Sequence, residues 1–401
     1  MKPAVRVALA AILVLAPLAT SVKAQEEGPS QATISYRWQL LNPEVNSFTF
    51  RHTYVAFEYR TVEKGTDTLP LERVDGFAMP GDYEAFADKS FTNAFIVMKD
   101  GKVVFEDYRN RMTADTPHIA FSMSKTITAM LVGIAVERGE IVSLEDPAER
   151  YVPELAGGGY EGVTIRQILE MRSGADIEER YDFGENPSLA AMIHETAIIR
   201  NEKRFADFAV DVGRKTEPGS TFNYATLDTA VLGWILEQAT GQTIEQQTQE
   251  RLWQPMGAEF DGYWLADGQP GLGRSLNGMG YNARLRDFAR LGQLMLDDGV
   301  ANGRRVLPDG WVGQMTAMKP TAMKPTGGEF PGYGLQTWQV DQEQGAYSAV
   351  GLAGQFIYVH PETRTVIVKL SYFPPIEPEG LTREVTDYFA AIAHTPAGAG
   401  G

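Results

Sequence analysis

Apolar and polar positions follow a strand-like pattern at the two ends of the chain. The β-rich runs 93–98 and 102–108 flank an Asp-Gly pair at residues 100–101, and such a pair between apolar runs predicts a β-hairpin. A second pair of strands is predicted at 355–359 and 365–371, because a short turn-forming stretch separates two apolar runs. Strands are therefore expected near both termini.

The middle of the chain follows a helical period instead. Residues 282–296 place their apolar side chains on one stripe, and residues 226–239 predict a helix that ends near Gly241. Residues 164–167 match the capping box that often begins a helix. A last helix is predicted at about 381–392.

This order of elements predicts an α+β fold. An antiparallel sheet would be assembled from both ends of the chain and flanked by helices, with a mostly helical region inserted between its halves. We expect a signal peptide at 1–24, an N-terminal part of the α/β domain at 25–145, the helical region at 146–300, a C-terminal part of the α/β domain at 301–394 and a flexible tail at 395–401.

Two segments are predicted to lie outside regular structure. Residues 25 to about 42 are polar and predict a poorly ordered lead-in. Residues 316–320 are repeated at once as 321–325, and both copies end in proline. Because two prolines so close together exclude a helix interior, we expect a surface loop there.

The first residues have the organisation of a cleavable export signal. Lys2 and Arg6 precede the short apolar run 7–18, and Val22-Lys23-Ala24 resembles a small-residue cleavage site. A membrane anchor is the alternative, but the run contains Pro17 and is short for a membrane span. We therefore predict cleavage after Ala24, export to a periplasm or out of the cell, and no stable membrane anchor afterwards.

Composition narrows the classes of partner and cofactor. The formal net charge is -16. The only charged residues of the leader are basic, so its loss would make the chain more acidic. Nucleic acid is therefore not expected as a partner. The chain has no cysteine, which excludes thiolate chemistry and disulfides. Its five histidines are scattered without close metal-ligand spacing, and we predict no metal and no cofactor.

Candidate chemistry begins at the tetrad Ser122-Met123-Ser124-Lys125, which opens the apolar run 126–134. Side chains three apart lie on one face of a helix, and the start of a helix favours developing negative charge. A serine hydroxyl needs a base, and Lys125 fills that role only if burial lowers its pKa. The side chain of Ser124 points about 100° away around the helix, so Ser122 is the candidate nucleophile. Because this spacing also recurs by chance, the tetrad alone is not specific.

Two further stretches have both an ordinary and a functional interpretation. Tyr224 follows Pro218-Gly219 and enters a helical region, where it would be a half-buried packing residue or a proton shuttle. The glycines of residues 351–355 precede an apolar strand. They would form a tight turn, or let the backbone lie close to a substrate.

Taken together and in this order, the three motifs resemble those of the penicillin-recognising serine hydrolases. The resemblance covers about residues 94–371 and includes the phrases at 152–155, 171–174, 218–224, 232–233, 239–241 and 283–292. Within that superfamily the chain is most similar to the class C β-lactamase-like branch. It looks closest to the esterases and 6-aminohexanoate-dimer hydrolases, whose third motif has the Gly-x-x-Gly-Gln form found here at 351–355.

The resemblance implies a role for each matching residue. Ser122 corresponds to the acyl-forming nucleophile, Lys125 to its base partner and Tyr224 to the tyrosine that relays protons. The backbone N–H groups of Ser122 and Gln355 would form the oxyanion hole, in which a donor is typically worth about 3 kcal/mol in the transition state. Which of Lys125 and Tyr224 is the formal base stays open.

Two departures from the family pattern concern substrate. Thr226 stands where β-lactamases carry asparagine, and Leu352-Ala353-Gly354 replaces their Lys-Thr-Gly. Leu352 has no charge with which to bind a substrate carboxylate, which argues against β-lactam hydrolysis and D,D-peptidase activity. The expected substrate-binding residues are Thr226, Leu352, Gly354, Tyr281 and Trp338.

The predicted function is an exported serine hydrolase that cleaves an ester or amide of a small molecule through a covalent acyl-enzyme. A β-lactamase or D,D-peptidase is the first alternative. A non-catalytic ligand sensor with the same fold is the second. A Ser-His-Asp hydrolase is disfavoured, because the chain contains no Gly-x-Ser-x-Gly elbow. The oligomeric state is left open.

Overall fold

The computed structural model of this chain describes residues 28–321, 330–340 and 345–397. The predicted signal peptide, the second copy of the repeat beyond Thr321 and the last residues of the tail lie outside the described residues. No helix in these three ranges is long and apolar enough to cross a membrane.

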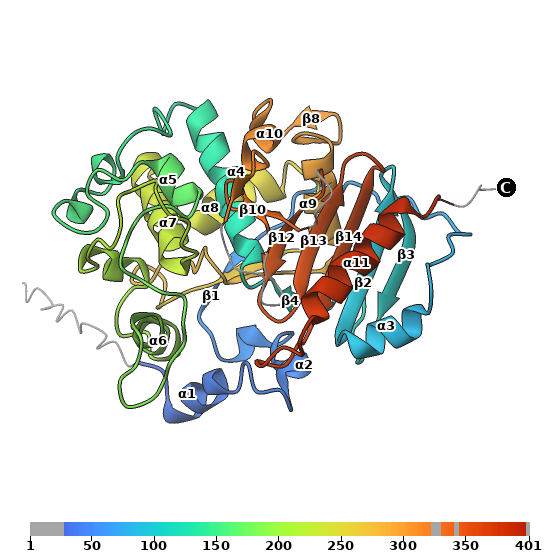
Figure 1. The fold of residues 1–401 in the computed structure, drawn as a ribbon, viewed down its shortest axis with the longest axis horizontal. Coiled ribbons are helices and arrows are strands. Elements are labelled where there is room, and N and C mark those ends of the chain that lie inside the picture. The colour runs from blue at the N-terminus through green and yellow to red at the C-terminus, as the bar shows by residue number, and fades with distance from the viewer. Residues whose placement is uncertain (1–27, 322–329, 341–344, 398–401) are drawn as a thin grey trace, which may run out of the picture.

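The fold is mixed α/β and is built around an antiparallel sheet, drawn in cyan and red in Figure 1. Strands from both ends of the chain meet where β2 pairs with β14, the second and third strands from the β3 edge of the sheet. In spatial order the eight strands are β3 (Lys102–Tyr108), β2 (Thr92–Lys99), β14 (Thr365–Ser371), β13 (Gln355–His360), β12 (Tyr347–Gly351), β11 (Trp338–Gln339), β10 (Gly332–Tyr333) and β9 (Lys319–Pro320). The predicted assembly of one sheet from both chain ends is thus confirmed.

Two smaller sheets complete the strands. One has the order β1 (Tyr59–Val62), β5 (Gly262–Leu265), β6 (Tyr281–Ala283) and β4 (His118–Ile119), and the other pairs β7 (Val300–Ala301) with β8 (Arg304–Arg305). The first of them is important for the site, because β4 leads directly into the helix that begins at the Ser-x-x-Lys tetrad.

The rest of the described chain consists of helices, short helical turns and loops. The α-helices are α1 (Gln31–Trp38), α2 (Asn46–Thr49), α3 (Tyr83–Lys89), α4 (Met123–Glu137), α5 (Ile165–Leu169), α6 (Leu189–Ile193), α7 (Thr226–Thr240), α8 (Ile244–Thr248), α9 (Leu285–Leu296), α10 (Trp311–Met315) and α11 (Leu381–His394). The shorter 3-10 and π turns are η1 (Thr53–Val55), η2 (Ala148–Arg150), η3 (Pro153–Leu155), η4 (His194–Ile199), η5 (Ala206–Val210) and η6 (Gln249–Trp253).

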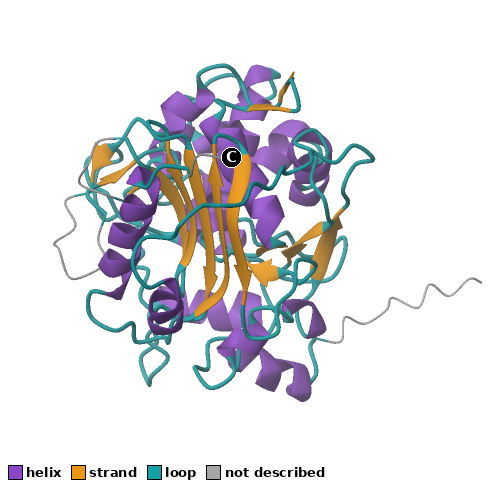
Figure 2. Ribbon diagram, turned by 90° about the vertical axis from the view of Figure 1, so that its right-hand side faces the viewer, coloured by secondary structure: helices purple, strands orange, loops and turns teal. Residues whose placement is uncertain are grey.

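Helices lie on both faces of the large sheet, as Figure 2 shows, and the strands β2, β13 and β14 are buried along their whole length. Successive side chains of a strand point to opposite faces, so β2 contributes to two separate cores. Phe95 and Val97 pack in the cluster that contains α3 and α11, whereas Ile96 and Met98 pack in the cluster that contains α4 and α9. Helix α4 is therefore buried between the sheet and the helical region.

Local sequence signals gave the correct elements in several places. The hairpin of β2 and β3 turns at Asp100 and Gly101, which both have positive φ. The capping box at Thr164 is present, and Gly241 ends α7 in the left-handed conformation.

Three predictions about local structure were wrong. Residues 319–320 of the expected surface loop form β9, because they pair with β10. Residues 31–38 of the expected lead-in form α1, whose Arg37 side chain is buried and donates to the carbonyls of Ala56, Ile198 and Ile199. Residues 282–283 belong to β6 and not to the following helix, because they pair with β4 and β5.

Candidate active site

Ser122 lies at the junction between β4 and α4, where it is the N-terminal capping residue of the helix. The residue before it, Phe121, adopts a φ of 44°, a left-handed conformation that costs a non-glycine residue roughly 1–2 kcal/mol. The ring of Phe121 is buried and packs edge-on against Phe50, with ring centroids 4.9 Å apart. Tertiary packing therefore holds the sharp turn that presents Ser122, which is itself half-buried.

Lys125 lies one turn along α4 and is 1% exposed. Its Nζ is 3.1 Å from Ser122 Oγ, 3.0 Å from Thr226 Oγ1 and 2.8 Å from the carbonyl oxygen of Gly278. Burial lowers the pKa of Lys125 to about 8, against the opposing effect of the nearby carboxylates of Glu179 and Asp228. The amine is thus held against the candidate nucleophile and loses its proton far more readily than a free lysine.

Tyr224 lies against the same pair of residues. Its ring centroid is 5.0 Å from Lys125 Nζ. Burial raises the pKa of Tyr224, although a side-chain hydrogen bond with Ser122 lowers it in part. Asn223, the preceding residue, donates its backbone N–H to Met171 and its side-chain amide to Ile177, which fixes this stretch of backbone. Ser122, Lys125 and Tyr224 are therefore brought together from segments about a hundred residues apart.

The end of β12 lies directly beside the nucleophile turn. A Cβ on Gly351 would lie 2.2 Å from the carbonyl oxygen of Ala120 and 3.2 Å from the backbone nitrogen of Ser122, so only glycine allows this approach. Gly351 pairs with Gln355 across the turn to β13. The two backbone segments expected to form the oxyanion hole are thus adjacent.

The Gln355 side chain holds that turn in shape. It is fully buried, and its amide donates to the carbonyls of Leu352, Ala353 and Ser371, while its oxygen accepts the N–H of Ser371. Sequence reasoning singled out the backbone N–H of this residue. The structure shows in addition that its side chain binds the backbone of the turn.

The expected substrate-binding residues are found in different environments. Leu352 is 52% exposed at the tip of the turn. Trp338 is half-buried and packs on Tyr224 and Tyr333, with centroids 5.4 and 4.5 Å away. These aromatic rings form a wall beside Tyr224.

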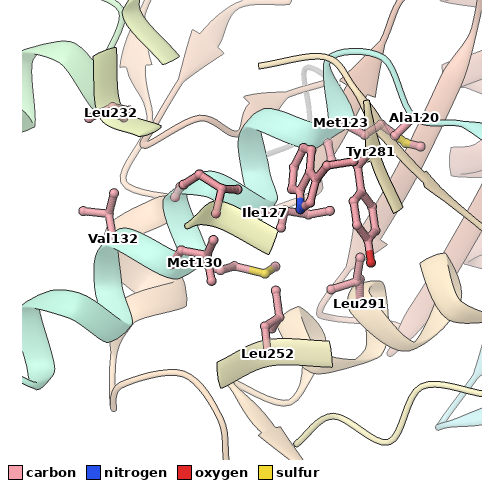
Figure 3. Close-up of a cluster of buried hydrophobic side chains, with 14 of the residues drawn as sticks. Ala120, Met123, Ile127, Met130, Val132, Leu232, Leu252, Tyr281 and Leu291 are labelled. Atoms are coloured by element: carbon pink, nitrogen blue, oxygen red, sulfur yellow. The ribbon is translucent and has the colours of Figure 1, made fainter. Parts of the chain in front are cut away.

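The other three residues of that set do not offer a free side chain to a substrate. Tyr281 is fully buried, and its ring packs among Trp253, Trp264 and Phe288 in the core drawn in Figure 3. Its expected place in a substrate pocket is therefore wrong, because β6 turns this side chain inward.

Thr226 and Gly354 also need correction. The Thr226 hydroxyl accepts a hydrogen bond from Lys125 and donates one to Glu179, so both of these neighbours occupy it. Gly354 has a φ of 80°, and a Cβ there would lie 2.4 Å from the Phe373 ring. Gly354 therefore serves the close packing of the turn.

Sequence reasoning missed two groups at this site. Glu179, in the loop between α5 and α6, binds Thr226 through both carboxylate oxygens. The Gly278 carbonyl accepts a hydrogen bond from Lys125. Neither residue belongs to a recognisable motif, and a backbone carbonyl leaves no signature in a sequence.

The histidine nearest to Ser122 in the sequence lies in the core. His118 precedes Ser122 closely in the chain but is fully buried, and its ring nitrogens contact the Asn93 side chain and the Ile119 carbonyl. Burial lowers the pKa of His118 to about 3. No cluster of three or more metal-ligating side chains occurs within the part of the chain that the structure describes.

Comparison with known proteins identifies the family of this chain. The family model described as Beta-lactamase matches residues 72–386. A 6-aminohexanoate-dimer hydrolase of Paenarthrobacter ureafaciens is 34% identical over 324 residues, which are 78% of this chain and 81% of that protein.

Solved structures share the fold at lower identity. The "Putative 6-aminohexanoate-dimer hydrolase from Bacillus anthracis" superimposes with a TM-score of 0.78 at 23% identity, covering 91% of this chain and 98% of that one. A family VIII carboxylesterase superimposes with a TM-score of 0.60 at 17% identity, covering 77% and 96%. The chain thus belongs to the Beta-lactamase family and is a serine hydrolase of the β-lactamase fold.

Proposed function

We propose that this hydrolase cleaves an ester or a linear amide of a small molecule through an acyl-enzyme formed on Ser122. The observation that supports this most directly is the buried Lys125 amine, 3.1 Å from Ser122 Oγ and with a pKa lowered to about 8. An amine so placed is suited to remove the serine proton near neutral pH.

In the proposed reaction neutral Lys125 takes the Ser122 proton as Oγ attacks the substrate carbonyl. The backbone N–H groups of Ser122 and Gln355 stabilise the oxyanion. Tyr224, whose raised pKa keeps its hydroxyl protonated, passes a proton to the leaving group. Water then attacks the acyl-enzyme with the same groups in reverse order, which releases the acid.

The pH dependence of the rate follows from the Lys125 pKa. Below about pH 8 the amine is protonated and unable to accept the Ser122 proton, so kcat/KM is expected to rise as the pH increases through about 8. The charged and titratable groups that face this amine are Glu179, Asp228 and Tyr224. A pH series of initial rates on a p-nitrophenyl ester measures this rise in kcat/KM, the acid limb of the pH profile. A flat profile between pH 6 and pH 9 would contradict the assignment.

Substrate preference is proposed to follow from Leu352, which is exposed where the related β-lactamases carry a lysine. Without that charge, a substrate carboxylate has no cationic partner at the turn. Leu352→Lys is therefore expected to increase kcat/KM on nitrocefin about tenfold, because a new charge-assisted bond is worth about 1.5 kcal/mol or more. Leu352→Gln, which adds polarity without charge, is the matched control. Equal gains for both variants would show that charge is not the missing element.

Export is proposed as well, on the strength of the leader-like residues 1–24. The full chain expressed in a Gram-negative host should yield a periplasmic product that begins after Ala24. N-terminal sequencing of that product measures the cleavage site.

A panel of substrates tests the proposed function. Purified protein is assayed on a p-nitrophenyl ester, a linear 6-aminohexanoate dimer and nitrocefin, and intact-mass spectrometry follows any acyl adduct. Turnover of the ester or linear amide, with little on nitrocefin, is the expected result. Fast nitrocefin turnover would make the protein a β-lactamase. A stable adduct without turnover would indicate a ligand sensor.

A further inference from the structure

We propose that Glu179 is a positioning residue that orients the Thr226 hydroxyl and thereby directs the lone pair of neutral Lys125 at Ser122. The inference rests on the proposed function, because it assigns Lys125 the role of base. It goes beyond that function by giving a task to a residue outside every motif.

The contacts of Glu179 define the direction of one hydrogen. Its Oε1 is 2.6 Å from Thr226 Oγ1, and its Oε2 accepts the backbone N–H of Thr226 over 2.7 Å. The Tyr181 hydroxyl also donates to Oε1, over 2.5 Å. A carboxylate only accepts hydrogen bonds, so the single hydroxyl hydrogen of Thr226 points at Glu179. Thr226 Oγ1 therefore presents only lone pairs to Lys125.

This constraint decides where the lone pair of Lys125 points. A protonated amine has three hydrogens, and the structure supplies three acceptors in Ser122, Thr226 and Gly278. A neutral amine has two hydrogens and one lone pair. Because Thr226 Oγ1 and the Gly278 carbonyl can only accept, they take both hydrogens. The lone pair is left for the one remaining partner, the Ser122 hydroxyl.

The identity of residue 226 explains why such an orienting group is needed. The amide oxygen of an asparagine accepts but cannot donate, whereas a threonine hydroxyl does both. A threonine left free would be able to rotate and donate its hydrogen to the lysine lone pair. It would then compete with Ser122. Glu179 removes that option.

Glutamine at position 179 gives a sharp test. The backbone N–H of Thr226 can only donate, so the glutamine oxygen is expected to face it. The glutamine NH₂ then faces Thr226 Oγ1 as a donor and frees the hydroxyl hydrogen to turn toward Lys125. The substitution thus puts a donor where Thr226 Oγ1 and the Tyr181 hydroxyl had an acceptor, with little change in shape.

Two effects of Glu179→Gln are expected, and they have different origins. The plateau of kcat at high pH falls at least tenfold with little change in KM, because fewer molecules aim the lone pair at Ser122. The acid limb of the pH profile moves to lower pH, because the Glu179 charge raises the pKa of Lys125 while Asp228 and Tyr224 remain in place. The shift of the limb reports the lost charge, whereas the fall of the kcat plateau at unchanged KM reports the orientation of the hydroxyl.

A double-mutant cycle with Thr226→Asn isolates the mechanism. An asparagine oxygen needs no orienting carboxylate, so Glu179→Gln is expected to cost less than threefold in the Thr226→Asn background. Glu178→Gln is the matched control, since Glu178 is the exposed neighbour that binds Lys215 over 2.8 Å. It should change neither the plateau nor the limb.

Opposite results would overturn the inference. An unchanged kcat plateau in Glu179→Gln would contradict it. An equal loss of kcat from Glu179→Gln in the wild type and in the Thr226→Asn variant would also contradict it. Should Glu179→Gln fail to fold, Thr226→Val and Thr226→Asn carry the test instead. Valine removes the acceptor and should cost at least tenfold relative to asparagine, and equal activity contradicts the proposal. Ser122→Ala separates the proposed function from the role proposed for Glu179. Turnover without Ser122 would refute the acyl-enzyme on Ser122, on which the role of Glu179 rests.

Discussion

Ser122→Ala is expected to reduce kcat/KM by at least about 10⁴-fold on any substrate that the wild type cleaves, because Ser122 is the proposed nucleophile and alanine has no oxygen with which to form the acyl-enzyme. The change removes one half-buried oxygen at the start of α4 and leaves the backbone N–H groups of the turn in place. Substrate binding should therefore survive, and KM should change little. Initial rates with the same preparation of substrate measure both constants.

Ser124→Ala is the control for this experiment. Ser124 is fully buried, and its hydroxyl accepts the backbone N–H of Tyr281 over 3.0 Å, so it cannot reach a substrate. We expect its kcat/KM to stay within about tenfold of the wild type, with a modest loss of stability from the unpaired N–H. If Ser124→Ala abolished the acyl adduct while Ser122→Ala kept it, the nucleophile would be assigned wrongly.

Lys125→Met is expected to have the second largest effect, a loss of about 10³-fold or more in kcat. Methionine has a similar length and is apolar, so it fills the same buried space without supplying a base. The remaining activity should no longer show the limb near pH 8. A profile that kept this limb would mean that another group is titrating.

The stability of Lys125→Met separates lost chemistry from lost structure. Burial lowers the Lys125 pKa from 10.5 to about 8, so the unfolded chain binds the proton more tightly than the folded one. The resulting penalty of about 3 kcal/mol is fully present below pH 8 and disappears as the pH rises from about 8 to 10.5.

Removing the amine relieves this penalty, but it leaves Thr226 Oγ1 and the Gly278 carbonyl without their donor, at about 1–3 kcal/mol each. The two effects nearly cancel. We expect the free energy of unfolding at pH 7 to stay within about 2 kcal/mol of the wild type, as measured by urea denaturation. A much larger decrease would indicate that the activity was lost through unfolding.

Much of the architecture was predictable because it depends on local signals. The tight turn between β2 and β3 requires positive φ, which an Asp-Gly pair adopts readily. Gly241 likewise tolerates the left-handed conformation that ends α7. Helix α1 was not predictable in this way. Its stability comes from Arg37 binding carbonyls of distant segments, and a window of polar residues gives no sign of such contacts.

Tyr281 illustrates the same limit within the site. It lies in a strand of only three residues, where alternation cannot reveal which side chain faces inward. From its sequence alone, a large aromatic residue such as Tyr281 would fit either the wall of a substrate pocket or the hydrophobic core. Its packing against Trp253 and Trp264 decided for the core.

The sequence by itself predicted Ser122 as the nucleophile and Lys125 as its base, because a spacing of three places two side chains on one face of any helix. The order of three motifs along the chain added Tyr224 and the strand with Gln355. Only the tertiary structure decided that Lys125 is buried, that the Gly278 carbonyl and Thr226 accept its hydrogens, and that Thr226 donates to Glu179. These features depend on which distant segments meet around the amine, and the environment of a group, more than its identity, sets its pKa and the direction of its lone pair.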